Sequence, residues 1–233
     1  MDRITYRNEK KYLLSRAEAE QIRARLGGLT ARDAHADAAG RYHIESLYFD
    51  DYRDSAFWDN ENGVTPRQKF RLRMYGRNAE SAFLELKCKE NTVTCKFSQK
   101  LSAQSAREVA AGDANALLRL SQPLSNSFAL QCLQKGLRPA AIVAYDREPF
   151  VYRTERVRVT FDTEICASAA VGRFLTGADG YVPVLPGDAV LMEVKYDAYL
   201  PGQIARALDI GVLQETKFSK YHICRKALTG KGE

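Results

Sequence analysis

The sequence predicts an α+β protein built on a largely antiparallel sheet, and two patterns lead to this prediction. Apolar and polar residues alternate with a period of two in several segments, as they do in strands with one buried face. Segments with helical spacing lie between and after them, and many gaps between strands are short enough for hairpins. With 233 residues the chain is long enough for a sizeable core, so we expect a single domain over residues 1–233.

The predicted elements follow the chain in this order. The strands are Arg3–Leu14, Arg41–Phe49, Arg67–Tyr75, Ser81–Lys89, Val93–Lys100, Ala140–Tyr152, Arg156–Thr163 and Ala189–Tyr196. Ser15 and Glu18 form a capping-box pattern for a first helix that runs to about Leu26. The other helices are Ala103–Ala111, Pro123–Lys135, Gly202–Leu208 and a last one near Ser219–Leu228. We expect loops in the stretches Gly27–Gly40 and Ala167–Pro186, which are rich in small, polar or turn-forming residues.

Composition narrows the class of protein. The five cysteines are odd in number and form no CxxC pair, which disfavours a disulfide framework or a structural zinc site and suggests a reducing cytoplasm. No apolar run approaches the ~20 residues that span a bilayer, and the first residues have no signal-peptide pattern. We therefore expect a cytoplasmic protein without membrane insertion, and a membrane-bound partner stays open. The net charge of +6 favours an anionic partner only mildly.

The polar faces of the predicted strands are rich in Lys and Arg. Residues on one face include Arg7, Lys11, Arg67, Lys69, Arg71, Arg73, Lys87, Lys89, Lys96, Lys100, Arg147, Arg156, Arg158 and Lys195. For any single strand, a solvated face explains this pattern. Two like charges ~6 Å apart, however, repel by about 3 kcal/mol at an effective dielectric constant of ~20. A bound polyanion would offset that repulsion, so the accumulation predicts a phosphate-rich ligand.

A few acids share these faces. Glu9, Glu85, Asp162 and Glu193 are either counter-charges to the cations or ligands of a divalent metal ion that bridges carboxylate and phosphate oxygens. Glu193 is the strongest metal candidate because it shares a strand face with Lys195.

The segment from Lys217 to Tyr221 is a second candidate anion site. A helix that begins near Ser219 would direct its free N–H groups at an anion, beside Lys217 and Lys220. A solvated, lysine-rich helix start is the alternative. Other chemistries lack their motifs: the sequence has no HExxH, no Gly-x-Ser-x-Gly and no GxxxxGK[ST].

Eight short motifs, in order along the chain, resemble the VTC (vacuolar transporter chaperone) domain family within the CYTH-like triphosphate tunnel metalloenzymes. They are Tyr6–Leu14 (YRNEKKYLL), Ser46–Asp50 (SLYFD), Phe70–Gly76 (FRLRMYG), Phe83–Lys87 (FLELK), Tyr145–Arg147 (YDR), Val157–Asp162 (VRVTFD), Leu191–Lys195 (LMEVK) and Lys217–Tyr221 (KFSKY). The resemblance implies an antiparallel barrel of about eight strands that forms a basic tunnel, with helices packed outside. It also implies Mn²⁺ or Mg²⁺ as cofactor and transfer of the terminal phosphoryl group of ATP to inorganic polyphosphate.

The resemblance assigns roles residue by residue. It implies phosphate-handling catalytic roles for Lys11, Arg71, Arg73, Lys87, Arg147 and Arg158. It implies further phosphate contacts from Lys96, Tyr145, Lys195, Lys217, Ser219 and Lys220, and metal ligation by Glu193 with Glu9.

The chain departs from the superfamily at its first motif. The ExExK signature is reduced to Arg7-Asn-Glu9-Lys-Lys11, a form common in VTC relatives, which argues against a typical triphosphatase. The SPX domain and the membrane spans of the eukaryotic relatives are also missing, so we expect a stand-alone, bacterial-type version.

Three functions stay open at this point, led by a polyphosphate polymerase. A tripolyphosphate or nucleoside triphosphate hydrolase is the second, and a non-catalytic polyphosphate-binding module is the third. Nucleic-acid binding ranks below them because most aromatic residues fall on the apolar strand faces rather than between the cations.

Overall fold

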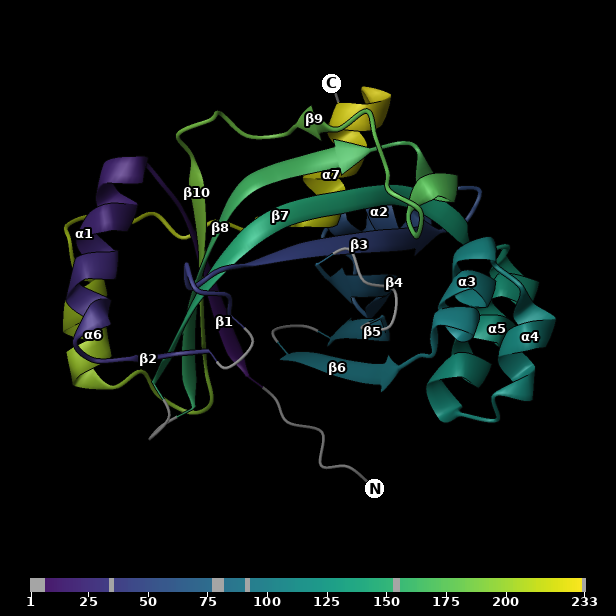
Figure 1. Cartoon of the computed structure of the whole chain (residues 1–233), viewed down its shortest axis with the longest axis horizontal. Coiled ribbons are helices and arrows are strands. Elements are labelled where there is room, and N and C mark those ends of the chain that lie inside the picture. Colours follow the sequence, from purple (N-terminus) through teal and green to yellow (C-terminus); the bar gives the residue numbers. More distant parts are fainter. Residues whose placement is uncertain (1–6, 34–35, 77–81, 91–92, 153–155, 232–233) are drawn as a thin grey trace.

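A strongly curved antiparallel sheet dominates the computed structural model, which describes residues 7–33, 36–76, 82–90, 93–152 and 156–231 (Figure 1). Its main path runs through β1 (Asn8–Leu14), β10 (Val190–Tyr196), β8 (Val157–Ser168), β7 (Arg138–Tyr152), β3 (Tyr42–Asp50), β4 (Arg67–Tyr75), β5 (Phe83–Glu90) and β6 (Val93–Lys100). Two short strands, β2 (Ala31–Arg32) and β9 (Val182–Pro183), pair beside this path. Every strand pair is antiparallel, which confirms the predicted α+β class.

Seven α-helices in the described residues surround the sheet. They are α1 (Arg16–Gly27), α2 (Ser55–Glu61), α3 (Ala103–Ala111), α4 (Ala114–Arg119), α5 (Pro123–Lys135), α6 (Gly202–Leu208) and α7 (Lys220–Thr229). Helices α3, α4 and α5 gather at one side of the molecule and α1 and α6 at the other (Figure 1). None of the helices in the described ranges is both long and apolar enough to cross a membrane.

The sheet curls into a half-barrel. In the described residues β1 and β6 are the two ends of the strand path and do not pair with each other. Side chains nevertheless cross the space between them, because Lys87 on β5 lies 3.1 Å from Glu9 on β1. Between β1 and β6, therefore, side chains rather than backbone hydrogen bonds close the interior that the sequence predicts.

The apolar strand faces pack against the helices. On the convex side, Phe70 and Leu72 of β4 belong to one core cluster with Phe128 of α5. Val159 of β8 lies in a second cluster with Ile22 of α1. Burial of such side chains stabilises the fold by roughly 1.5–3 kcal/mol each. The helices thus cover the convex face and leave the polar face turned inward.

Helix α7 is different because it packs on the concave face. Tyr221 stacks on Tyr48 of β3 with 5.0 Å between ring centroids. The Tyr48 hydroxyl in turn accepts a hydrogen bond from Arg71, which marks the polar side of the sheet. Helix α7 therefore brings its own residues into the interior of the half-barrel.

The element predictions are largely confirmed. Strands β4 and β6 and helices α3, α5 and α6 have the predicted bounds. Helix α1 begins with the predicted capping box, in which the Ser15 backbone N–H donates to Glu18 and the Glu18 N–H donates to the Ser15 hydroxyl. The first part of the predicted strand Arg3–Leu14, residues 3–6, lies outside the described residues.

The prediction missed α2, α4, β2 and β9. Helix α2 spans seven residues, and its sequence, SAFWDNE, shows no clear helical period. Its first N–H groups donate to the carboxylate of Asp50 at the end of β3, at 2.9 Å from Ala56 and 3.1 Å from Phe57. This helix start depends on a carboxylate outside its own capping position, so a search for a local cap overlooks it.

Candidate active site

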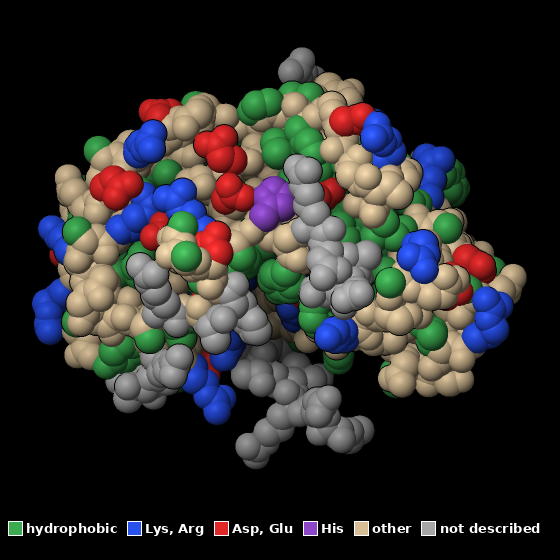
Figure 2. All heavy atoms as spheres, in the orientation of Figure 1, with side chains coloured by type: hydrophobic (Ala, Val, Ile, Leu, Met, Phe, Trp, Pro, Cys, Tyr) green, Lys and Arg blue, Asp and Glu red, His purple; other side chains and the backbone are tan. Residues whose placement is uncertain are grey.

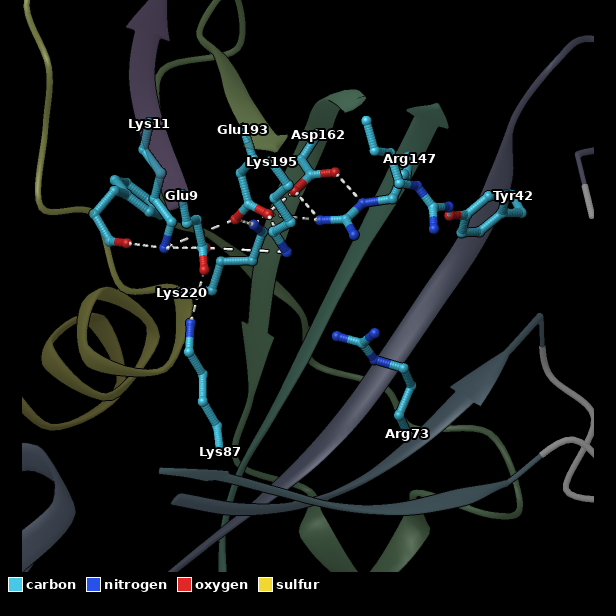
Figure 3. A network of polar contacts seen from close by, with 12 residues as sticks. Glu9, Lys11, Tyr42, Arg73, Lys87, Arg147, Asp162, Glu193, Lys195 and Lys220 are labelled. Carbon is cyan, nitrogen blue, oxygen red and sulfur yellow. Dashed lines mark hydrogen bonds and ion pairs between the residues drawn. The ribbon is translucent and has the colours of Figure 1, made fainter. Parts of the chain in front are cut away.

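Cations from seven strands and α7 meet on the concave face of the sheet. We call the group the central cluster, and its members are Lys11, Arg71, Arg73, Lys87, Lys96, Arg147, Arg158, Lys195 and Lys220, with the acids Glu9, Glu85, Asp162 and Glu193. Figure 3 shows side chains from β1, β4, β5, β7, β10 and α7 that point into a common space. On the outer face drawn in Figure 2, by contrast, Lys and Arg are interspersed with Asp and Glu.

Two buried acids hold one side of the central cluster. Asp162 of β8 is 0% exposed and Glu193 of β10 is 5% exposed. Arg147 donates to Asp162 in a two-pronged contact, at 2.6 and 2.7 Å, and also lies 3.3 Å from Glu193. Lys220 lies 2.6 Å from Asp162 and 2.9 Å from Glu193.

The cations decide the ionisation of these acids. Burial alone would raise the pKa of Asp162, but Arg147 and Lys220 outweigh it and hold that pKa below its ordinary value. The same balance, led by Lys220 and Lys195 among the cations, holds the pKa of Glu193 well below the ordinary range. Both carboxylates are therefore ionised at neutral pH and can act as fixed negative charges.

Glu9 of β1 connects this group to the opposite side of the half-barrel. Its carboxylate lies 3.3 Å from Lys11, 3.1 Å from Lys87 and 4.0 Å from Lys195. Lys11 and Lys195 also lie 3.8 and 3.5 Å from Glu193. Two lysines are thus shared between Glu9 and Glu193.

Glu85 of β5 organises the other side. It lies 2.6 Å from Arg71 and 2.5 Å from Lys96, and 3.6 Å from Nε of Arg73. Burial is the largest influence on Lys96 and lowers its pKa to about 8, although Glu85 opposes this. Arg71 is held in place by this carboxylate and by the Tyr48 hydroxyl, 2.8 Å away.

Arg73 is the least satisfied cation of the central cluster. Its residue is 6% exposed, and its buried Nε has no hydrogen-bond partner among the described residues. The side chain points from β4 toward the common space below Arg147 (Figure 3). A buried donor without a partner costs about 1–3 kcal/mol, so an anion that accepted this hydrogen bond would be favoured.

The remaining predicted residues lie around this space. Arg158 donates to Asp33 at 2.7 Å and to the Tyr42 hydroxyl at 2.6 Å. Tyr145 is buried beneath two cations: Arg147 and Lys220 lie 5.2 and 4.8 Å from its ring centroid. Its ring therefore supports these cations through cation–π contact.

The two lysines of the predicted anion site at the start of α7 do not lie together in one site. Lys220 is buried in the central cluster, whereas Lys217 is exposed and has no ion-pair partner in the described part of the chain. The Ser219 hydroxyl caps α7 by accepting the His222 N–H at 3.5 Å, and it also accepts a hydrogen bond from Lys69 at 3.1 Å. The two lysines therefore face different surroundings.

Sequence reasoning missed several partners in the interior. Tyr42 and Tyr48 share the strand face of the cations, so the period-two rule could have identified them. Asn60, which accepts a hydrogen bond from Lys69 at 3.0 Å, lies on the unpredicted helix α2 and carried no signal. Asp33 lies in a stretch predicted as loop.

A metal ion fits this arrangement only together with phosphate. Among the described residues, no group of three or more His, Cys, Asp or Glu side chains could hold a metal ion. Glu9 and Glu193 are two ionised carboxylates that share Lys11 and Lys195. Mg²⁺ commonly takes one or two carboxylates and completes its shell with substrate phosphates and water. The donor set therefore suits a cation that arrives with a phosphate ligand.

The fold and the site define the class of protein, an antiparallel half-barrel with a cation-rich interior. The chain belongs to the VTC domain family, whose model matches residues 6–229. A comparison with curated proteins gives no match.

Solved structures share the fold at low sequence identity. HpAC1 from Hippeastrum, a candidate adenylyl cyclase described as having a dominant triphosphatase activity, is 14% identical with a TM-score of 0.56, over 96% of both chains. A candidate adenylate cyclase from Vibrio parahaemolyticus is 11% identical with a TM-score of 0.53, over 95% of this chain and 98% of the other. PH1819 from Pyrococcus horikoshii is 14% identical with a TM-score of 0.50, over 95% and 99%. These likenesses support the fold.

Proposed function

We propose that this protein is a polyphosphate polymerase that transfers the terminal phosphoryl group of ATP to a polyphosphate chain. The observation that carries the proposal is the central cluster, in which cations from opposite sides of the half-barrel face one space and outnumber the acids among them. Arg73 supports it most directly, because its buried Nε has no hydrogen-bond partner among the described residues. A chain of phosphates supplies many acceptor oxygens at once.

The residues suit phosphoryl transfer without a covalent intermediate. The transition state of this reaction is loose, so catalysis needs alignment of the reacting groups and neutralisation of charge on the phosphoryl oxygens. In this proposal Arg71, Arg73 and Arg147 bind those oxygens. Preorganised donors in a site sheltered from water are worth more than the same donors in solution.

The buried acids position these arginines. Asp162 holds Arg147 in a planar two-pronged contact, and Glu85 holds Arg71. Because the guanidinium groups are fixed before substrate binds, less conformational entropy is lost on binding.

Glu193 and Glu9 are the residues proposed to hold Mn²⁺ or Mg²⁺. When bound, the ion supplies Lewis-acid neutralisation of phosphate oxygens. Lys11 and Lys195, which lie between these carboxylates, would contact phosphate oxygens of the same ligand.

The test is incubation with ATP and Mn²⁺ or Mg²⁺, followed by a gel that separates phosphate chains by length. Long chains that disappear on treatment with a chelator are the expected result. Free phosphate without chains would reassign the protein as a hydrolase. Tight tripolyphosphate binding without turnover under either metal would leave a binding module.

A hydrolase is the second candidate, and one observation favours it. HpAC1, which shares the fold over 96% of both chains, is described as a triphosphatase. The two activities differ in whether water or a phosphate chain accepts the phosphoryl group. Addition of a long polyphosphate primer distinguishes them, because it should accelerate loss of ATP only in a polymerase.

The proposed setting is the cytoplasm. All five cysteines are free thiols, as expected for a reducing compartment.

A further inference from the structure

A second group of cations extends the concave face beyond the central cluster. We call it the acid-free strip, and its members are Arg67, Lys69, Lys89 and Lys217. They come from the start of β4, the end of β5 and the segment before α7. Within the described ranges, none of them forms an ion pair with a carboxylate. In the central cluster, by contrast, carboxylates approach the cations closely.

The strand register places like charges opposite each other in the strip. Arg67 lies opposite Lys89, and Lys69 lies opposite Lys87. One step further along the same two strands, Arg71 lies opposite Glu85, an attractive pair. Like charges directly across an antiparallel pair destabilise the sheet. Like charges also lie opposite each other in the central cluster, where Lys87 faces Lys96. There, however, Glu9 lies 3.1 Å from Lys87 and Glu85 lies 2.5 Å from Lys96, whereas no carboxylate in the described residues forms an ion pair with Arg67 or Lys89.

Lys69 shows this cost most clearly. Its ammonium group donates to two neutral oxygens, Oδ1 of Asn60 at 3.0 Å and Oγ of Ser219 at 3.1 Å. Burial is the main cause that lowers its pKa to about 7, and Arg67 and Lys87 lower it further. Such a group gains a full charge and a strong partner if an anion binds beside it.

The other members repeat the pattern. Among the residues that the structure describes, Arg67 donates only to backbone carbonyls, those of Asp59 at 3.4 Å and Val64 at 3.2 Å. Burial, then Arg67, Lys11 and Lys217, lower the pKa of Lys89. Among the charged groups that act on Lys69 and Lys89, other cations thus have the largest effect.

The strip continues the path of the central cluster. Arg71, Lys69 and Arg67 follow one another on one face of β4 at steps of roughly 6.6 Å. The hydrogen bond between Lys69 and Ser219 joins β4 to the start of α7, next to Lys217. A linear anion that left Arg71 along β4 would meet the strip without a gap.

We propose that the acid-free strip binds the phosphate units of a linear polyphosphate that extend beyond the triphosphate held in the central cluster. This inference rests on the proposed function, because it takes the central cluster as the triphosphate site. A repeating anion suits the strip better than a single phosphate does, since each of several separate cations lacks a counter-charge. The strip would make the protein prefer long chains over short ones.

The test measures binding of two probes, inorganic tripolyphosphate and long-chain polyphosphate. The proteins are the wild type, the triple variant R67Q/K69Q/K89Q, and a control triple variant, K10Q/R16Q/R107Q. The control removes the same charge from exposed positions on β1, α1 and α3. Each charged hydrogen bond lost costs about 1.5–3 kcal/mol, or roughly ten- to a hundredfold in affinity.

We expect the strip variant to lose at least about tenfold in affinity for long chains and to keep its affinity for tripolyphosphate. The control should bind both probes like the wild type. Equal losses for both probes, or an unchanged affinity for long chains, would overturn the inference. If the wild type bound neither probe, the proposed function itself would fail with it.

Folding of the triple variant does not weaken the test. Its substitutions remove mutual repulsion, so its melting temperature should not fall below that of the wild type. The single variant Lys69→Gln provides a second measurement in the same direction. An unchanged preference for long chains in that variant, with the fold intact, would also count against the strip.

Discussion

The two ends of the β4 cation row differ in one respect, which is the presence of acids. At Arg71 and Arg73 the neighbouring strand supplies Glu85. At Lys69 and Arg67 the opposite residues are lysines. A carboxylate holds a neighbouring cation in place before a ligand binds. A cation without such a carboxylate keeps a positive charge that an anionic ligand can neutralise. The comparison separates residues that position the site from residues whose charge awaits an anion.

The largest expected effect concerns the central cluster, where acids accompany the cations. Glu193→Gln should abolish metal-dependent turnover, because it removes one of two carboxylates proposed to hold the metal ion. Tripolyphosphate binding in the presence of chelator should persist, since the variant removes a negative charge from a cationic site. Turnover assays with Mn²⁺ and Mg²⁺ check this, and an unchanged rate would remove Glu193 from the metal site.

The next effect is on stability. Asp162→Asn should lower the free energy of unfolding by about 3–5 kcal/mol, because Arg147 and Lys220 would lose a buried counter-charge. Denaturant titration measures it. Glu20→Gln is the matched control, since its ion pair with Arg23 is exposed on the Glu20 side and should change stability by less than ~1 kcal/mol. Equal changes in the two variants would contradict the assignment of Asp162 as a buried organiser.

In contrast to Asp162, Arg73 should matter more for ligand binding than for stability. Arg73→Gln should weaken tripolyphosphate binding roughly ten- to a hundredfold, because it removes a charged donor aimed into the site. It should cost little stability, because in the described residues the buried Nε forms no hydrogen bond and lies 3.6 Å from Glu85, a carboxylate that Arg71 and Lys96 approach more closely. Calorimetric binding and thermal melting together test this. A large loss of stability with unchanged binding would show that Arg73 is structural.

The smallest effect is a pH dependence of long-chain binding. Lys69 has its pKa lowered to about 7, so it is charged below that pH and neutral above it. An anion favours the charged form, and affinity should therefore fall as pH rises from 7 to 8.5, by at most about tenfold per pH unit. The charged or titratable groups near Lys69 in the described residues are Arg67, Lys87, Lys11, Asp50, His222 and Tyr221. Lys69→Gln should flatten the profile, and a profile identical to that of the wild type would exclude this lysine as the cause.

Much of this architecture could be predicted from local patterns. Strands β4 and β6 were predicted to the residue because alternating side chains report directly on a two-faced strand. The capping box of α1 was equally visible, since Ser15 and Glu18 interact within one turn. Helix α2 was not, because its N-terminal donors depend on Asp50 as well as on its own short sequence.

The candidate site was predicted as a set of residues but not as an arrangement. The predicted cations Arg71, Arg147 and Lys220 do lie in one interior. Nothing in the sequence indicated that Arg147 and Lys220 would share Asp162, or that Lys69 would meet Asn60 and Ser219. These partnerships join residues up to 150 positions apart along the chain.

Period-two alternation alone dictates which side chains share a face, because successive residues of any strand point to opposite sides. It holds whether the sheet is flat, open or curled. The curl of the sheet and the docking of α7 on its concave side turn that shared face into an interior. Both depend on packing between segments that are distant in the sequence. The sequence alone therefore determines which charges share a strand face. The enclosure of that face and the pairing of its charges are determined only by the tertiary structure.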